Sequence, residues 1–80
     1  MTKSRTLASH YSVAAARLGM ILDALRETAD REAAQRAVAY CRRRAAGSRE
    51  SPKAEANINA IAERHGLSLD WIFDSNARAA

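Results

Sequence analysis

The residues of this sequence that are best suited to chemistry are arginines gathered in its middle third. From residue 31 to residue 53, seven basic side chains against two acidic ones give the segment a charge of +5, whereas the whole chain carries +4. The run Arg42–Arg44 turns through three directions on a helix, so its guanidinium groups cannot all be buried. Basic side chains bind a phosphate backbone by releasing its condensed counterions. We therefore predict a nucleic-acid surface formed by Arg36, Arg42, Arg43, Arg44, Arg49 and Lys53.

The same charge is open to two other interpretations. A basic helix end can be solvated without binding anything, and cations near the end of a helix also interact favourably with its dipole. An acidic protein surface is a further partner for such a segment. All three interpretations remain open at the level of the sequence.

The titratable and nucleophilic side chains do not form a pattern that is typical of an enzyme. The two histidines lie far from each other and from Cys41, and no HxxxH or CxxC spacing is present, so no metal site is predicted. Ser48 and Ser51 have no paired base nearby in the sequence, and no glycine-rich phosphate loop exists. His65 is expected to pack on an apolar helix face. We expect a non-enzymatic protein without cofactor, metal or small-molecule substrate.

Length and composition indicate one small domain. Eighty residues allow a single core, and alanine makes up much of the 48% hydrophobic fraction, so large apolar side chains are few. We therefore expect a homodimer, or a partner that covers one face. The lone Cys41 excludes an internal disulfide and indicates a reducing, cytoplasmic location. No apolar run approaches the roughly 20 residues of a membrane span, so no membrane association is expected.

Apolar residues recur at three- and four-residue steps, which predicts an all-α fold. No alternating run typical of a strand is present. The expected architecture is a small four-helix bundle with helices at about 10–27, 30–46, 52–65 and 68–74. The single domain would extend over residues 10–75, between flexible tails at 1–9 and 76–80.

The first predicted helix presents a leucine-rich stripe that we expect to form the core. The stripe consists of Ala14, Leu18, Ile21, Leu22 and Leu25. Nothing between Met20 and Ala46 breaks a helix outright, so one long rod is the alternative to two helices. We favour a turn near Thr28–Asp30, because a compact domain needs the chain to fold back.

The strongest local signals lie between residues 51 and 74. Ser51 and Pro52 are typical of a helix start, and Gly66 stands where a left-handed C-cap residue is needed. A short helix follows, and we expect it to pack on the leucine-rich stripe. Where this helix is only partly covered, its aromatic residues Trp71 and Phe73 are the candidate partner-binding residues.

The stretch IAERHGLSLDWIF resembles the last two helices of XRE-type, lambda-repressor-like DNA-binding domains. The matching positions are Ile61, Ala62, Glu63, Gly66, Leu67, Ser68, Leu69, Asp70, Trp71 and Ile72. The resemblance implies lambda-repressor-like packing of these two helices, which are structural in that family. An earlier helix-turn-helix reads the bases there, and no recognition helix is evident between residues 28 and 51, so no base-reading residue is carried over.

Two functions from different classes follow from these observations. The leading hypothesis is a small, non-enzymatic, XRE-like regulatory protein that contacts nucleic acid through the arginine-rich helix end and the loop after it. The competing hypothesis is a protein-binding module, such as a phage-type inhibitor or adaptor, that reuses repressor-like helices to bind a protein partner. The missing recognition helix and the acids beside Trp71 favour the second.

Overall fold

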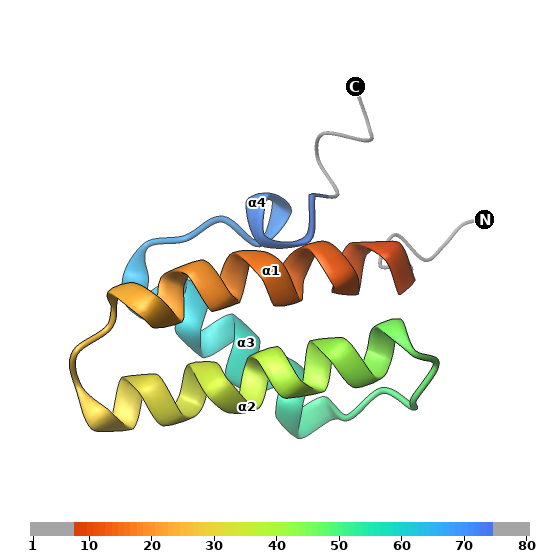
Figure 1. Ribbon diagram of the computed structural model, residues 1–80, viewed down its shortest axis with the longest axis horizontal. Helices are drawn as coiled ribbons and strands as arrows, with labels where there is room; N and C mark the ends of the chain where they lie inside the picture. Colours follow the sequence, from red (N-terminus) through yellow and green to blue (C-terminus); the bar gives the residue numbers. More distant parts are fainter. Residues whose placement is uncertain (1–7, 75–80) are drawn as a thin grey trace.

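Four α-helices make up the computed structural model, which describes residues 8–74 (Figure 1). They are α1 (Ala8–Ala24), α2 (Thr28–Ala45), α3 (Pro52–His65) and α4 (Leu69–Phe73). The predicted all-α class is confirmed, and each predicted helix boundary lies within three residues of the observed one. Most of the two predicted tails lies outside the described residues. None of these four helices is long and apolar enough to span a membrane.

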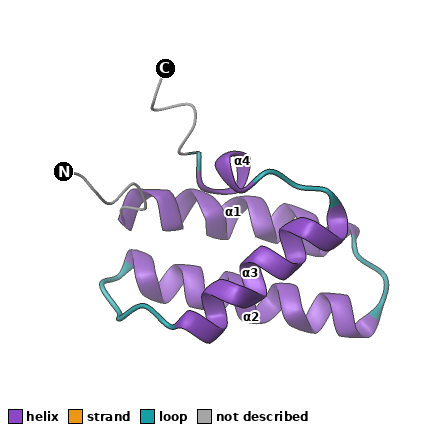
Figure 2. Ribbon diagram, turned by 180° about the vertical axis from the view of Figure 1, so that it is seen from behind, coloured by secondary structure: helices purple, strands orange, loops and turns teal. Residues whose placement is uncertain are grey.

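The helices pack as an antiparallel pair with two further helices against it. α1 and α2 lie side by side, and α3 crosses the pair on the face seen in Figure 2. The short α4 lies along α1, so the last described helix packs against the first (Figure 1). The result is a compact globule of three substantial helices and one short one.

A turn separates α1 from α2, so the alternative of a single long rod is wrong. α1 ends at Ala24 and α2 begins at Thr28. The guanidinium of Arg31 reaches back over this turn and donates from Nη1 to the carbonyl oxygens of Leu22 (3.0 Å) and Leu25 (3.1 Å). These carbonyls lie where a helix end leaves acceptors unsatisfied, so Arg31 caps α1 from the next helix.

The capping signals read in the second half of the chain are confirmed. The Ser51 hydroxyl accepts a hydrogen bond from the Ala54 N–H at 3.3 Å, and α3 starts at Pro52. Gly66 ends α3 with φ of 67°, a left-handed conformation in which glycine avoids the clash of a β-carbon. The Ser68 hydroxyl then accepts from the Trp71 N–H at 3.3 Å and starts α4.

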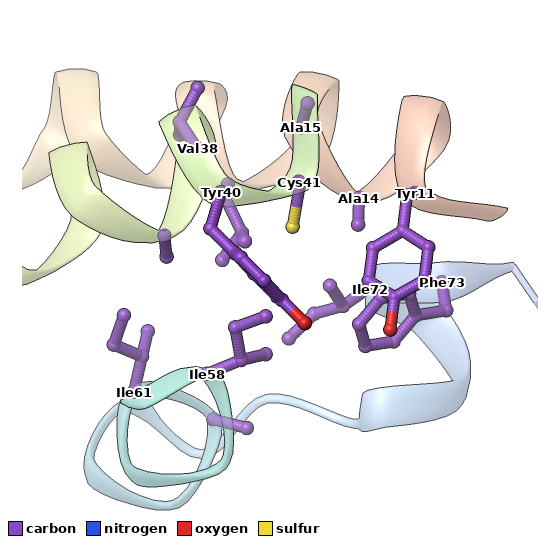
Figure 3. Close-up of a cluster of buried hydrophobic side chains, with 13 residues drawn as sticks. Tyr11, Ala14, Ala15, Val38, Tyr40, Cys41, Ile58, Ile61, Ile72 and Phe73 are labelled. Atoms are coloured by element: carbon purple, nitrogen blue, oxygen red, sulfur yellow. The ribbon is translucent and has the colours of Figure 1, made fainter. Parts of the chain in front are cut away.

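The core lies where α2, α3 and α4 meet the first half of α1 (Figure 3). Small residues on α1 and α2 allow close packing of the pair, and Tyr11, Ile58 and Ile72 fill the space below it. The buried cluster consists of Tyr11, Ala14, Ala15, Leu18, Ala37, Val38, Tyr40, Cys41, Ile58, Ile61, Ala62, Ile72 and Phe73.

The expected core stripe on α1 is correct only for its first two members. Ala14 and Leu18 are completely buried, whereas Ile21, Leu22 and Leu25 are half-buried. The polar and aromatic contacts of α4 are made with turns of α1 that precede Leu18. Phe73 packs edge-on against Tyr11, and Arg17 donates to the Trp71 carbonyl. The stripe was misplaced because α4 lies beside the first half of α1, which an apolar pattern alone does not reveal.

Candidate functional site

Part of the basic segment lines a groove between α2 and α3. Arg36 and Arg43 lie two turns apart on one face of α2, and Lys53 faces them from the first turn of α3. The groove has a volume of about 570 Å³. The described residues that line this basic groove are Arg36, Ala39, Tyr40, Arg43, Ser51, Lys53, Ala54 and Asn57.

The basic groove carries three positive charges, and no carboxylate is among the described residues that line it. Arg36, Arg43 and Lys53 are all exposed, so their charged groups face solvent at the groove. A concave surface with charges of one sign concentrates the local potential and attracts counterions. The arrangement therefore suits an anionic ligand.

A hydrogen-bonded network fixes the floor of the basic groove. The Tyr40 hydroxyl donates to Glu55 Oε2 at 2.7 Å and accepts from the Ser51 N–H at 3.1 Å. The Tyr11 hydroxyl donates to the same carboxylate oxygen. One carboxylate on α3 thus links α1, α2 and the start of α3. The network holds the first turn of α3, which carries Lys53, in place beside α2.

Both tyrosine hydroxyls of this network stay protonated and continue to donate at neutral pH. Burial, followed by the hydrogen bond to Glu55, raises the pKa of Tyr11 far above its usual value of 10. Burial is also the main reason that the pKa of Tyr40 is raised. The tyrosine rings pack edge to face with centroids 6.1 Å apart, and Figure 3 shows both within the core.

The three consecutive arginines point in three directions, as predicted, and they do not form one surface. Arg43 lines the basic groove, whereas Arg42 lines a different groove between α1 and α2. Arg44 is half-buried: its guanidinium carbon lies 4.7 Å from the Tyr11 ring centroid, and its Nη1 donates to the Ser48 carbonyl at 2.6 Å. Arg44 thus acts in packing and in holding the α2–α3 loop.

The other predicted site residues lie apart from the basic groove. Arg49 is exposed in the α2–α3 loop and is not among the residues lining the groove. Trp71 is 40% exposed, and the Arg17 guanidinium lies 5.1 Å from its ring centroid. Phe73 is buried, with its ring centroid 5.2 Å from that of Tyr11. Of the two aromatic residues, Trp71 is the one at the surface.

The cysteine and the two histidines, whose side chains could act as nucleophiles or metal ligands, are buried or half-buried within the fold. Cys41 is fully buried, and burial raises the pKa of its thiol to about 12, so it stays protonated and unreactive at neutral pH. His65 is half-buried, and His10, which the sequence did not single out, is buried on α1. Among residues 8–74, no three His, Cys, Asp or Glu side chains gather to hold a metal ion.

Comparison of the chain with family models, with curated proteins and with solved structures gave no match. Its candidate function therefore depends on the geometry of the site itself.

Some residues that line the basic groove were not predicted from the sequence. Tyr40 lies between Arg36 and Arg43 at helical spacing, and this signal was available from the sequence alone. Asn57 joins the groove only because α3 crosses α2, and its Nδ2 donates to the Ala33 carbonyl at 3.0 Å. The sequence of α3 alone does not predict this contact between Asn57 and Ala33.

Proposed function

We propose that the protein is a small, non-enzymatic regulatory protein of the XRE-like class that binds nucleic acid in the basic groove between α2 and α3. The observation that supports this proposal most directly is the placement of Arg36, Arg43 and Lys53 around one groove with no lining carboxylate. The cations come from two helices, and the network centred on Glu55 holds these helices together. The backbone positions that carry the three cations are therefore already placed around the groove before a ligand binds.

The expected mode of binding is contact with the phosphate backbone. Arginine guanidinium groups match phosphate oxygens through paired N–H donors, and the lysine adds a compact positive charge. Phosphate contacts position a protein on nucleic acid but carry no sequence information directly. We therefore propose that this groove contributes salt-dependent affinity with little preference for base sequence. Arg49, exposed in the adjoining loop, would extend the same contact.

The resemblance of residues 61–73 to XRE-type domains is a second, independent support. In this chain the corresponding corner joins α3 to α4 and returns the chain to α1. The helices that this corner resembles are structural in that family. We therefore propose that the corner holds α3 in place and does not itself contact the nucleic acid.

Fluorescence anisotropy with labelled duplex DNA at two or more salt concentrations tests the proposal. Binding should weaken steeply with salt, with a log–log slope of about −0.9 for each phosphate neutralised. In the double variant Arg36→Ala/Arg43→Ala, the affinity should fall and the slope should become shallower by about 2. The matched control is Arg26→Ala/Arg64→Ala, which removes the same charge from exposed positions outside the groove, together with the ion pair between Arg64 and Asp30 (2.8 Å).

Two results would contradict the proposal. One is a lack of binding by the unaltered protein even at low salt. The other is an equal loss of affinity in the groove variant and in its control, which would indicate attraction by net charge alone. Circular dichroism of each variant shows whether the helices are retained.

One observation favours the competing function, a module that binds a protein partner. Trp71 and Leu69 on α4 are both 40% exposed, and exposed aromatic residues are frequent anchors of protein interfaces. The same set of variants separates the two functions. If the groove binds nucleic acid, Trp71→Ala leaves DNA affinity unchanged. A stoichiometric complex with a protein that survives nuclease and is lost in Trp71→Ala would favour the module.

A further inference from the structure

A second groove lies between the second half of α1 and α2. Its volume is about 480 Å³, and apolar residues form most of its lining. Each helix contributes a row of residues at helical spacing: 16, 19, 20 and 23 on α1, and 35, 38, 39 and 42 on α2. The full lining of this α1–α2 groove is Ala16, Gly19, Met20, Leu22, Asp23, Gln35, Val38, Ala39 and Arg42.

The α1–α2 groove combines a projecting apolar side chain with an open space beside it. Met20 is 64% exposed, more than any other large apolar side chain among residues 8–74. Apart from the two chain neighbours of Gly19 and the surrounding backbone of its own helix, no atom lies within 4 Å of the position that a β-carbon would occupy there. A flexible methionine next to an unfilled position is well suited to packing against another surface.

The two ends of the α1–α2 groove carry opposite charges. Asp23 lies one residue before the end of α1, and Arg42 lies in the last turn of α2. Because the two helices are antiparallel, these C-terminal ends lie at opposite ends of the pair (Figure 1). Both side chains are exposed. The groove therefore runs from a carboxylate, past an apolar centre, to a guanidinium.

We propose that a second copy of this chain binds to the α1–α2 groove about a two-fold axis. In such an interface the same patch faces itself after a half-turn. A half-turn about an axis that lies in the interface, perpendicular to the line from Asp23 to Arg42, exchanges these two positions, so Asp23 meets the partner's Arg42 and Arg42 meets the partner's Asp23. The two Met20 side chains meet near the centre, where the open space beside the partner's Gly19 receives them. The charges at the two ends of the α1–α2 groove are therefore complementary to those of a second, identical groove.

This inference goes beyond the proposed nucleic-acid function and does not depend on it. The two grooves are distinct surfaces of α2 that share Ala39, which lines both. Arg36 and Arg43 line only the basic groove, on the other side of Ala39. The dimer would therefore carry two basic grooves, each formed within one copy of the chain.

Sedimentation equilibrium with charge-reversal variants tests the dimer. The unaltered protein should be in monomer–dimer equilibrium. Asp23→Arg places cations opposite cations at both ends of the interface, and Arg42→Asp places acids opposite acids. Each single variant should raise the dimer dissociation constant by roughly tenfold or more, because two ion pairs become two repulsions. The matched controls are Glu63→Arg and Arg49→Asp, which make the same charge changes at exposed positions outside the groove and should leave the constant unchanged.

Mixing the two single variants gives the sharpest outcome. Asp23→Arg and Arg42→Asp should each be largely monomeric alone but should form a heterodimer together, since every pair across the axis is then opposite in sign. The double variant Asp23→Arg/Arg42→Asp should regain self-association for the same reason. Far-ultraviolet circular dichroism of each variant confirms that the helices remain folded.

Three results would overturn the inference. The first is an unaltered protein that stays monomeric at the highest concentration at which it dissolves. The second is a dimer that the single reversals do not weaken. The third is a pair of single variants that fail to associate on mixing although both are folded.

Discussion

The two halves of α1 differ in what covers them. All five buried residues of this helix lie between His10 and Leu18, and none lies between Gly19 and Ala24. Yet the second half carries Met20, Ile21 and Leu22, whereas the first half is rich in alanine. Burial on α1 is therefore decided by the helices that reach it, and not by which turn is more apolar.

The first half of α1 compensates for its small side chains with one large residue. Tyr11 packs edge-on against Phe73, lies under the Arg44 guanidinium and donates to Glu55. Its side chain thus contacts groups from α2, α3 and α4, while the neighbouring alanines let α2 approach closely. No residue of the second half is buried, and Met20 and Leu22 line the α1–α2 groove.

Truncation of one side chain in each half of α1 is the strongest test of this difference in burial. Leu18→Ala removes a fully buried side chain and should lower the free energy of unfolding by about 2–5 kcal/mol. Met20→Ala, two residues later, should change it by no more than about 0.5 kcal/mol, because the side chain is already exposed. Urea unfolding followed by circular dichroism, at a concentration where the protein is monomeric, measures both. Equal losses would show that the second half contributes as much as the first.

Alkaline pH should destabilise the protein through groups that lie beneath the first half alone. Burial raises the pKa of Cys41 to about 12 from a usual 9, and the pKa values of Tyr11 and Tyr40 are also raised. Above pH 9, and further above pH 10, the unfolded chain loses protons that the folded chain keeps. From pH 7 to about pH 9 these groups leave the free energy of unfolding unchanged, and above pH 9 it should fall by roughly 1.4 kcal/mol per pH unit for each such group.

Urea midpoints measured from pH 7 to pH 11 would follow this decline. Tyr11→Phe serves as the control, since it keeps the ring but removes one of the titrating hydroxyls. It should be less stable at pH 7, by about 1 kcal/mol for the lost hydrogen bond, and should show a shallower decline above pH 10. An unchanged slope in this variant would mean that Tyr11 is not protected by the fold.

The smallest expected effect is a gain in stability in the second half of α1. Gly19 lies inside the helix with open space beside it, so Gly19→Ala should stabilise the monomer by up to about 1 kcal/mol. The same change at Gly66, where φ is 67°, should destabilise by about 1–2 kcal/mol, because a β-carbon is strained in that conformation. Thermal unfolding of the two variants compares the signs directly, and a loss of stability at Gly19 would show that the space is not free.

The helix boundaries and caps could be predicted because they depend on neighbours in the sequence. Ser51, Gly66 and Ser68 act within three or four residues of their own position, and each was found where its type indicated. The core of α1 could not be predicted in the same way. The stripe was inferred from hydrophobicity, but its burial depends on α3 and α4, and the nearer of these begins at Pro52, 28 residues after α1 ends at Ala24.

The candidate site shows the same division. The two arginines of the basic groove on α2 are visible as a helical spacing, whereas Lys53 joins them only because α3 crosses α2. Arg31 and Arg44 were counted as free charge, yet one caps α1 and the other packs on Tyr11. Counting charges in the sequence locates a basic region. It does not distinguish the cations that are free to bind a ligand from those that stabilise the fold by capping or packing.

The position of the chain's single tryptophan makes the attachment of α4 visible to spectroscopy. A five-residue helix is too short to persist alone in water, so α4 is ordered by its contacts with α1. Trp71 sits at that junction, where its carbonyl accepts from Arg17 and its ring lies beside the same guanidinium. Its emission spectrum therefore reports whether α4 is docked on α1, separately from the unfolding of the other three helices.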